Sequence, residues 1–138
     1  YSIYWQGTID RVVFDPTTQG MVAKEVFPTY ESRNEHAFLT IHPEGKYMYI
    51  TGANCLYKSM FNPETKEFQK PTMFAGSEGA SAWVDSPGTA GQVNGYIDGE
   101  LRTEARFDSP CGIAYDEETQ TFYIADRENH RIRTISVE

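Results

Sequence analysis

The chain has 138 residues, of which 39% are hydrophobic, 14% aromatic and 23% charged. This aromatic content excludes a disordered chain, and no stretch approaches the roughly 20 apolar residues of a membrane-spanning helix. Twenty acidic residues against twelve Lys and Arg give a net charge of −8, which argues against a basic surface for nucleic acid.

Aromatic and β-branched runs separated by turn signals predict an all-β chain without a convincing helical period. Ten strands are expected, near residues 2–6, 9–14, 21–27, 37–41, 46–51, 55–61, 68–75, 111–116, 121–126 and 131–137. Residues 100–107 are expected to form one short helical turn at most. The consecutive apolar run 47–50 predicts a strand that is covered on both faces.

A repeat organises these strands. The turn Asp15-Pro16-Thr17-Thr18 matches Asn62-Pro63-Glu64-Thr65, and Asp116 opens a similar turn without Pro. Alignment from these turns places Ile9, Leu56 and Ile132 at one repeat position. The step of 47 residues from Ile9 to Leu56 is close to the roughly 40–50 of one four-stranded propeller blade. The next step, 76 residues, is longer because of the Gly/Ser/Ala-rich stretch 77–105.

The sequence therefore predicts a partial β-propeller of about two and a half four-stranded blades. Blade remnants are expected at about residues 1–30, 36–76 and 108–138, with an inter-blade insert at 77–107. Closed propellers have roughly four to eight blades, so we expect the C-terminal part of a larger propeller. Its two end faces would be apolar, and we expect the missing blades or a second copy to cover them.

Several motifs occur in a fixed order between residue 74 and the C-terminus. They are Phe74-Ala75-Gly76, Gly95-Tyr96-Ile97-Asp98-Gly99, Glu104-Ala105-Arg106-Phe107, Ser109-Pro110-Cys111-Gly112-Ile113-Ala114, Phe122-Tyr123-Ile124-Ala125-Asp126 and Asn129-His130-Arg131-Ile132-Arg133. This segment resembles the NHL-repeat family of β-propellers, whose name comes from the Asn-His-Arg-Ile type of run. The second repeat departs from the pattern, because Ala53-Asn54-Cys55 replaces Asn129-His130-Arg131.

The long form with Gly-Tyr-x-Asp-Gly resembles repeats of bacterial cell-surface proteins, in which NHL propellers often follow immunoglobulin-like IPT/TIG domains. Such proteins are commonly exported lipoproteins of gut Bacteroidetes, and some are thought to bind glycans. The resemblance implies a non-catalytic binding or scaffold propeller at the cell surface or in the periplasm. Its partner would be a carbohydrate or a protein, with no nucleic acid and no membrane span.

An enzyme is the alternative. Some NHL-like propellers are amidating lyases with zinc and calcium, which would make this chain part of a metal-dependent lyase or hydrolase acting at the propeller axis. No catalytic residue, metal ligand or cofactor is predicted, because His36, His42 and His130 lack a metal-binding spacing. Zinc would need histidines from different blades. Asp98 is more typical of a tight turn than of a calcium site.

The run Asp126, Asn129, His130 and Arg131 is expected to be a structural motif. Short polar side chains bind turn backbone well, and an arginine can place two hydrogen bonds on a carboxylate. The other interpretation is a polar site at the hairpin. Because the motif recurs in each blade of the family whatever the function, we favour the structural role.

The best candidates for ligand binding are Trp83, Asp85 and Tyr96 in the insert. Loops on a rigid scaffold often carry function, and an exposed indole can stack on a sugar ring or a protein partner. The competing interpretation packs Trp83 against its own blade. Cys55 and Cys111 fall in strands of different blades and are predicted to be free thiols.

Overall fold

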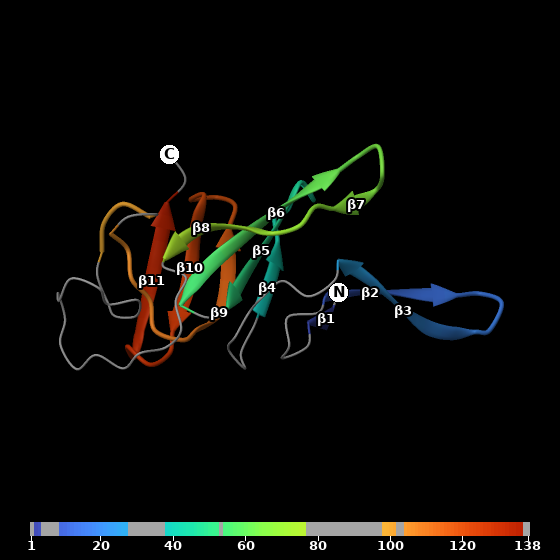
Figure 1. The fold of residues 1–138 in the computed structure, drawn as a ribbon, viewed down its shortest axis with the longest axis horizontal. Helices are drawn as coiled ribbons and strands as arrows, with labels where there is room; N and C mark the ends of the chain where they lie inside the picture. The colour runs from blue at the N-terminus through green and yellow to red at the C-terminus, as the bar shows by residue number, and fades with distance from the viewer. Residues whose placement is uncertain are drawn as a thin grey trace.

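The computed structural model describes residues 2–3, 9–27, 38–52, 54–76, 98–101 and 104–136. These residues form eleven β-strands and no helix, arranged in three antiparallel sheets (Figure 1). We name the sheets by their strands: the β1–β3 sheet, the β4–β8 sheet and the β9–β11 sheet. The predicted all-β class is confirmed.

The β1–β3 sheet consists of β1 (Ser2–Ile3), β2 (Ile9–Asp15) and β3 (Gly20–Phe27). The long β2–β3 hairpin extends away from the other strands (Figure 1). At its tip, the amide of Thr17 donates to Asp15 Oδ1 at 2.8 Å. This bond holds the pKa of Asp15 below its usual value, as expected for an Asp that opens a turn.

The β4–β8 sheet consists of β4 (Phe38–Ile41), β5 (Tyr47–Gly52), β6 (Cys55–Asn62), β7 (Glu67–Phe68) and β8 (Thr72–Gly76). Both β7 and β8 pair with β6. The single strand predicted at 68–75 is thus two strands. Pro71 lies between them, and its missing N–H prevents a continuous ladder.

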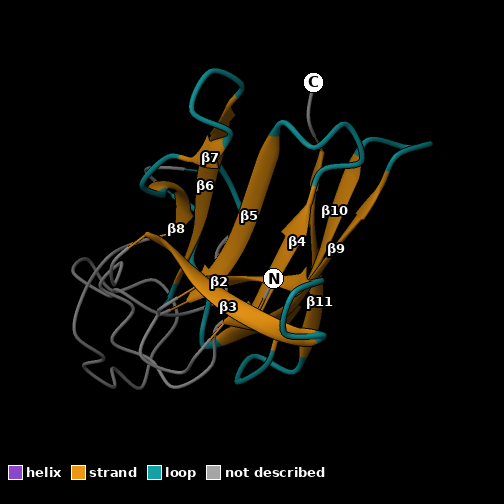
Figure 2. Ribbon diagram, turned by 90° about the vertical axis from the view of Figure 1, so that its right-hand side faces the viewer, coloured by secondary structure: helices purple, strands orange, loops and turns teal. Residues whose placement is uncertain are grey.

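The β9–β11 sheet is a three-stranded meander of β9 (Pro110–Asp116), β10 (Thr121–Asp126) and β11 (Arg131–Ser136), with β10 in the middle. It packs against the β4–β8 sheet (Figure 2). The rings of Tyr49 and Phe122 meet between the two sheets with their centroids 4.4 Å apart. A second link is polar, since the amide of Ser109 donates to Oδ1 of buried Asn54 at 3.1 Å.

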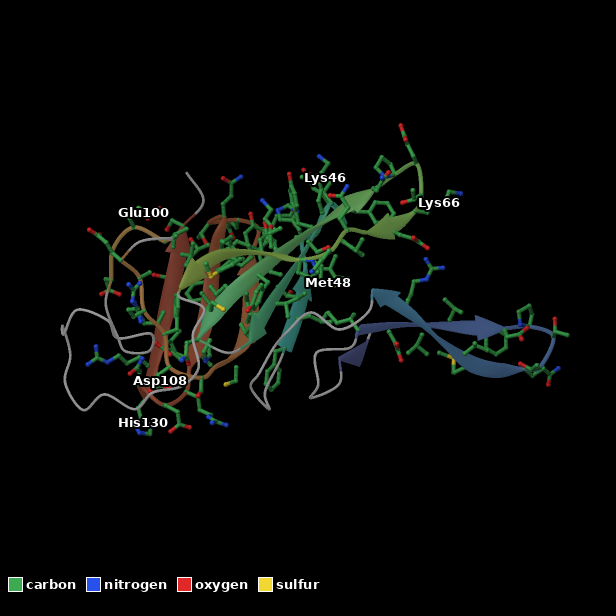
Figure 3. All side chains as sticks on the ribbon, viewed as in Figure 1. Lys46, Met48, Lys66, Glu100, Asp108 and His130 are labelled. Carbon is green, nitrogen blue, oxygen red and sulfur yellow. The ribbon has the colours of Figure 1, made fainter. Side chains whose placement is uncertain are left out.

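A separate core joins the other face of the β4–β8 sheet to the β1–β3 sheet. Ile9 of β2 packs there with Met48 and Ile50, and all three are completely buried. Met48 lies in the interior between these strands (Figure 3). The consecutive apolar run 47–50 is therefore divided between two cores, as predicted for a strand that is covered on both faces.

Antiparallel sheets stacked face to face in this way form a partial β-propeller, as the sequence predicts. The number of blades and the division of the chain into blade remnants stay predictions.

The end of the predicted insert contributes to the core. Ala105 and Phe107 are buried between the β4–β8 and β9–β11 sheets. The amides of Glu104 and Ala105 both donate to the carbonyl of Glu100 at 2.9 Å, which gives the single turn expected in this segment. Beside it lies Gly76, whose φ is +90° and where an added Cβ would come within 2.5 Å of the Asn54 carbonyl. This position requires glycine.

Candidate functional site

A buried carboxylate organises the β9–β11 sheet. Asp126 ends β10 and has no exposed surface. Its oxygens accept hydrogen bonds from the amide of Asp108 at 2.7 Å, from Asn129 Nδ2 at 2.9 Å and from Arg133 Nη1 at 2.9 Å. One acidic side chain therefore joins the strand to the segment before β9, to its own turn and to β11.

Burial raises the pKa of Asp126 above its ordinary value. The hydrogen bonds from Asn129, Asp108 and Arg133 lower the pKa, but the loss of hydration outweighs them. A raised pKa often marks an acid–base residue. Here each carboxylate oxygen already accepts hydrogen bonds from protein groups.

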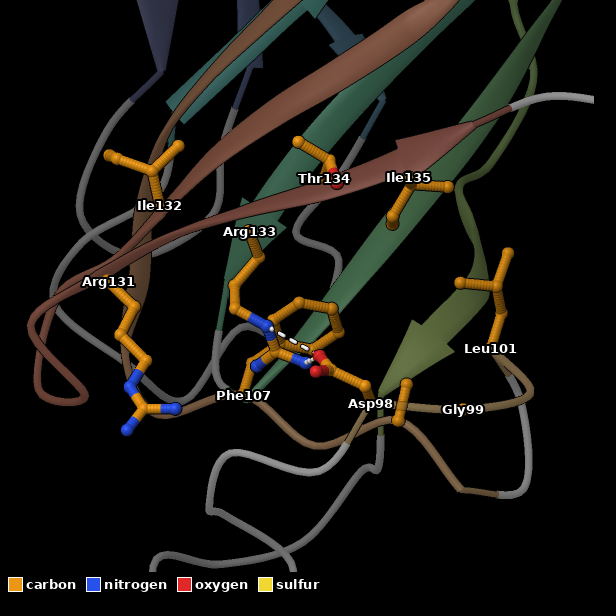
Figure 4. Close-up of a pocket in the computed structure, with 10 residues that line it drawn as sticks. Asp98, Gly99, Leu101, Phe107, Arg131, Ile132, Arg133, Thr134 and Ile135 are labelled. Atoms are coloured by element: carbon orange, nitrogen blue, oxygen red, sulfur yellow. Dashed lines mark hydrogen bonds and ion pairs between the residues drawn. The ribbon is translucent and has the colours of Figure 1, made fainter.

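Arg133 of β11 connects this carboxylate to the solvent side. Its Nη1 also donates to the carbonyl of Arg106 at 2.9 Å, and its Nε donates to Asp98 Oδ1 at 3.1 Å. The guanidinium lies over the ring of Phe107, 5.1 Å from the centroid (Figure 4). Asp98 itself is exposed, so Arg133 carries one buried and one exposed ion pair.

The structure brings together only part of the predicted motif. Asp126 and Asn129 are in contact, and His130 occupies the left-handed region at φ 51° where its amide donates to the carbonyl of Arg127. His130 and Asp108 appear at the same end of the molecule in Figure 3. Arg131 is exposed. The guanidinium that contacts Asp126 belongs to Arg133.

Arg133 is absent from the predicted site residues, although the sequence contains a signal for it. Arg131 and Arg133 are two residues apart on one strand, so both project from the same face of the sheet. The choice between them depends on where the buried carboxylate lies across that face.

A pocket of about 500 Å³ lies along β11 (Figure 4). It is lined by Asp98, Gly99, Leu101, Ala105, Phe107, Arg131, Ile132, Arg133, Thr134 and Ile135. The lining combines two guanidinium groups, a carboxylate and an aromatic ring with aliphatic side chains. Such a mixture can hydrogen-bond to hydroxyl or carboxylate groups and pack against a flat apolar surface.

The predicted ligand-binding residues Trp83, Asp85 and Tyr96 lie outside the described residues. Within the described ranges, no group of three or more His, Cys, Asp or Glu side chains is arranged to hold a metal ion. Cys55 and Cys111 are both free thiols, which confirms that prediction. No helix in the part of the chain that the structure describes is long and apolar enough to cross a bilayer.

Residues 107–135 match the model of the NHL repeat, which confirms the resemblance over this segment. The matched residues include β9, β10 and most of β11, together with Asp126, Asn129 and Arg133. No curated protein matches the chain.

Three solved structures from Bacteroides are similar to this chain. An auxiliary nutrient binding protein of Bacteroides thetaiotaomicron is 28% identical, with a TM-score of 0.40, and the match covers 96% of this chain and 43% of that one. An auxiliary nutrient binding protein of Bacteroides ovatus is 25% identical, with a TM-score of 0.45, and the match covers 100% and 45%. A candidate phosphatase of Bacteroides thetaiotaomicron is 22% identical, with a TM-score of 0.44, and the match covers 98% and 44%. The chain spans less than half the length of each.

Proposed function

From the NHL repeat at residues 107–135, we propose that this chain is a non-catalytic binding module of a bacterial cell-surface protein, with a carbohydrate or a protein as its ligand. The observation that carries the proposal is that the polar side chains of the repeat form hydrogen bonds within the protein itself. Asp126, Asn129 and Arg133 bind one another and the backbone, so they build the scaffold. The surface location rests on the resemblance of the Gly-Tyr-x-Asp-Gly form to cell-surface repeats.

The pocket beside β11 is the ligand site in this proposal. Arg131 and Asp98 offer charged groups to hydroxyls, and Leu101 and exposed Ile132 offer apolar surface to the ring of a sugar or to a side chain. Trp83, Asp85 and Tyr96 of the insert are proposed as further ligand-binding residues, because loops on a rigid scaffold often carry function.

The test begins with an array of glycans and peptides, and the strongest hit is then titrated calorimetrically against variants. Arg131→Ala should weaken binding by about tenfold or more, because a hydrogen bond to a charged group contributes roughly 1.5–3 kcal/mol. The matched control is Arg127→Ala, which removes an exposed arginine that pairs with Glu128 outside the pocket. Trp83→Ala tests the insert.

Equal binding by the wild type, Arg131→Ala and Trp83→Ala would remove both the pocket and the insert from the proposal. Bound zinc or calcium by elemental analysis, together with hydrolytic or lyase activity, would instead support the enzyme alternative.

A further inference from the structure

Asp98 in the pocket beside β11 faces solvent, yet its carboxylate is held in place. Its side chain is 93% exposed. Its Oδ1 accepts hydrogen bonds from both Nε and Nη2 of Arg133, whose own side chain is only 10% exposed (Figure 4). Arg133 is in turn fixed by buried Asp126 and by the carbonyl of Arg106. The pocket therefore contains an exposed carboxylate that is positioned by a buried network.

The backbone next to this carboxylate is fixed as well. Gly99 has a φ of 155°, and a Cβ added there would collide with the carboxylate of Glu104. The same carboxylate accepts the amide of Glu100 at 3.0 Å. The carbonyl of Leu101 accepts the amide of Gly76 at 2.9 Å, which attaches this segment to β8. Because the site is ordered before a ligand arrives, little conformational entropy is lost on binding.

The hydrogen bonds of Asp98 leave one of its oxygens available. A carboxylate has about four acceptor sites, two on each oxygen. Both bonds from Arg133 end on Oδ1, and none of the residues that the structure describes donates to Oδ2. Oδ2 can therefore accept about two protons from a ligand. Hydrogen bonds to a charged acceptor are roughly twice as strong as those between neutral groups.

The charges around the pocket favour a neutral ligand. Arg131 and Arg133 line the pocket together with Asp98. A cationic side chain would face two guanidinium groups, and an anionic group would be repelled at Oδ2 of Asp98, the acceptor that is available. A hydroxyl group both donates and accepts hydrogen bonds, so a neutral ligand rich in hydroxyls can donate to Asp98 and accept from Arg131.

We propose that the pocket binds a neutral carbohydrate, and that Asp98 selects this ligand by accepting hydrogen bonds from hydroxyl groups on adjacent ring carbons. The inference rests on the proposed function, because it assigns a ligand class to the same pocket. Adjacent hydroxyls lie close enough to share one oxygen. The N–H groups of an extended peptide point in alternate directions, which suits a single acceptor oxygen less well.

The test uses the full chain and the carbohydrate that binds most strongly on a glycan array, titrated calorimetrically. Asp98→Asn keeps the size of the side chain and an oxygen for Arg133, but it puts an NH₂ donor in place of Oδ2. This variant should bind about tenfold more weakly, because the charged acceptor is lost. The matched control is Asp15→Asn at the tip of the β2–β3 hairpin, since Asn62 opens the equivalent turn of the β4–β8 sheet. The control should bind as the wild type does.

Monodeoxy forms of the same carbohydrate test the contact itself. Loss of the hydroxyl that donates to Asp98 should weaken binding to the wild type about tenfold and binding to Asp98→Asn much less. A side chain that only supports the fold would change the affinity for every analogue alike. An unchanged melting temperature of Asp98→Asn would show that the variant folds.

The outcomes separate this inference from the proposed function. Carbohydrate binding that falls in Arg131→Ala but not in Asp98→Asn overturns the inference and leaves the proposed function standing. A peptide or an acidic glycan as the strongest ligand of the pocket has the same consequence. If no member of the glycan and peptide arrays binds, both proposals are overturned.

Discussion

At the scale of single residues, the contact between Asp126 and Arg133 holds the NHL repeat together. Asp126 is completely buried, and Arg133 is the cationic group bound to it at 2.9 Å. A buried ion pair adds little net stability over an apolar pair, but the loss of one partner leaves an uncompensated charge. The network is therefore sensitive to truncation on either side.

Arg133→Ala should lower the free energy of unfolding by about 3–5 kcal/mol, as expected when one partner of a buried pair is removed. Denaturant titration measures this loss. The double variant Arg133→Ala with Asp126→Asn should recover part of it, because the unpaired carboxylate is then absent. The control is Arg127→Ala, whose exposed pair with Glu128 contributes at most about 1 kcal/mol. Equal losses in the two arginine variants would contradict the proposed role of Arg133.

Asp126 should also leave a signature in the pH dependence of stability. Its pKa is raised in the folded state by burial, so the folded protein retains this proton to higher pH than the unfolded chain does. The contribution of Asp126 to the free energy of unfolding therefore falls as the pH rises from the ordinary pKa of an aspartate, which holds in the unfolded chain, through the raised pKa of the folded protein. Thermal melts of the wild type and of Asp126→Asn, recorded from acid to neutral pH, isolate this effect. The wild type should lose stability relative to the variant as pH rises, and the opposite trend would show a lowered pKa.

At the scale of the elements, four hairpin turns share one backbone pattern. Each begins with Asp or Asn, and the fourth residue after it has a positive φ: Gln19 at 54°, Lys66 at 58°, Gln120 at 52° and His130 at 51°. The first three turns were predicted from their Asp and Asn residues. The turn from Asp126 to His130 was interpreted as a polar cluster, although its spacing is the same.

Because a non-glycine residue in this conformation costs free energy, Gln120→Gly should stabilise the protein by about 0.5–1 kcal/mol, after allowance for the backbone entropy of glycine. Denaturant titration measures the gain. Glu117→Gly changes the same turn at a residue without positive φ, and it should give no gain. A loss of stability in Gln120→Gly would show that its side chain contributes more than the backbone costs.

The strands also show which parts of the fold could be predicted from the sequence. Strands were predictable wherever aromatic and β-branched runs end at Asp, Asn or Pro turns, since both signals are local. The break at Pro71 was missed because Phe68 before it and Thr72 and Phe74 after it favour strands. Ala105 and Phe107 were assigned to an insert, because nothing local shows that they fill the space between two sheets.

The candidate site was predictable to a similar extent. Asp126 and Asn129 stand in a recognisable run, whereas the role of Arg133 depends on contacts with Asp98 and Arg106 that are distant in sequence. The pocket beside β11 is likewise assembled from separate segments.

At the scale of the whole molecule, stability depends on contacts between sheets. Tyr49 lies in the core between the β4–β8 and β9–β11 sheets, and burial raises the pKa of its phenol to about 12. Charge repulsion from neighbouring Tyr47 and Tyr115 raises this pKa further. Since an ionised phenol is disfavoured at this position, ionisation of Tyr49 should weaken the packing between the two sheets.

The wild type should therefore lose stability as pH rises from 10, the ordinary pKa of the phenol, toward the value of about 12 in the folded protein. Tyr49→Phe keeps the ring and removes the titrating group, so its stability should fall less over the same range. Urea denaturation at stepwise increasing pH measures the difference. Parallel losses in the two proteins would mean that other groups govern alkaline unfolding.

The same aromatic residues form a chain across the two sheets. Ring contacts run from Tyr47 to Tyr49, from Tyr49 to Phe122, and from Phe122 to Tyr115. Aromatic chromophores held in such an asymmetric array couple optically, and the coupling of Tyr49 to Phe122 disappears when the sheets separate. The near-ultraviolet circular dichroism of these tyrosines is thus a built-in reporter of inter-sheet packing, and it requires no added label.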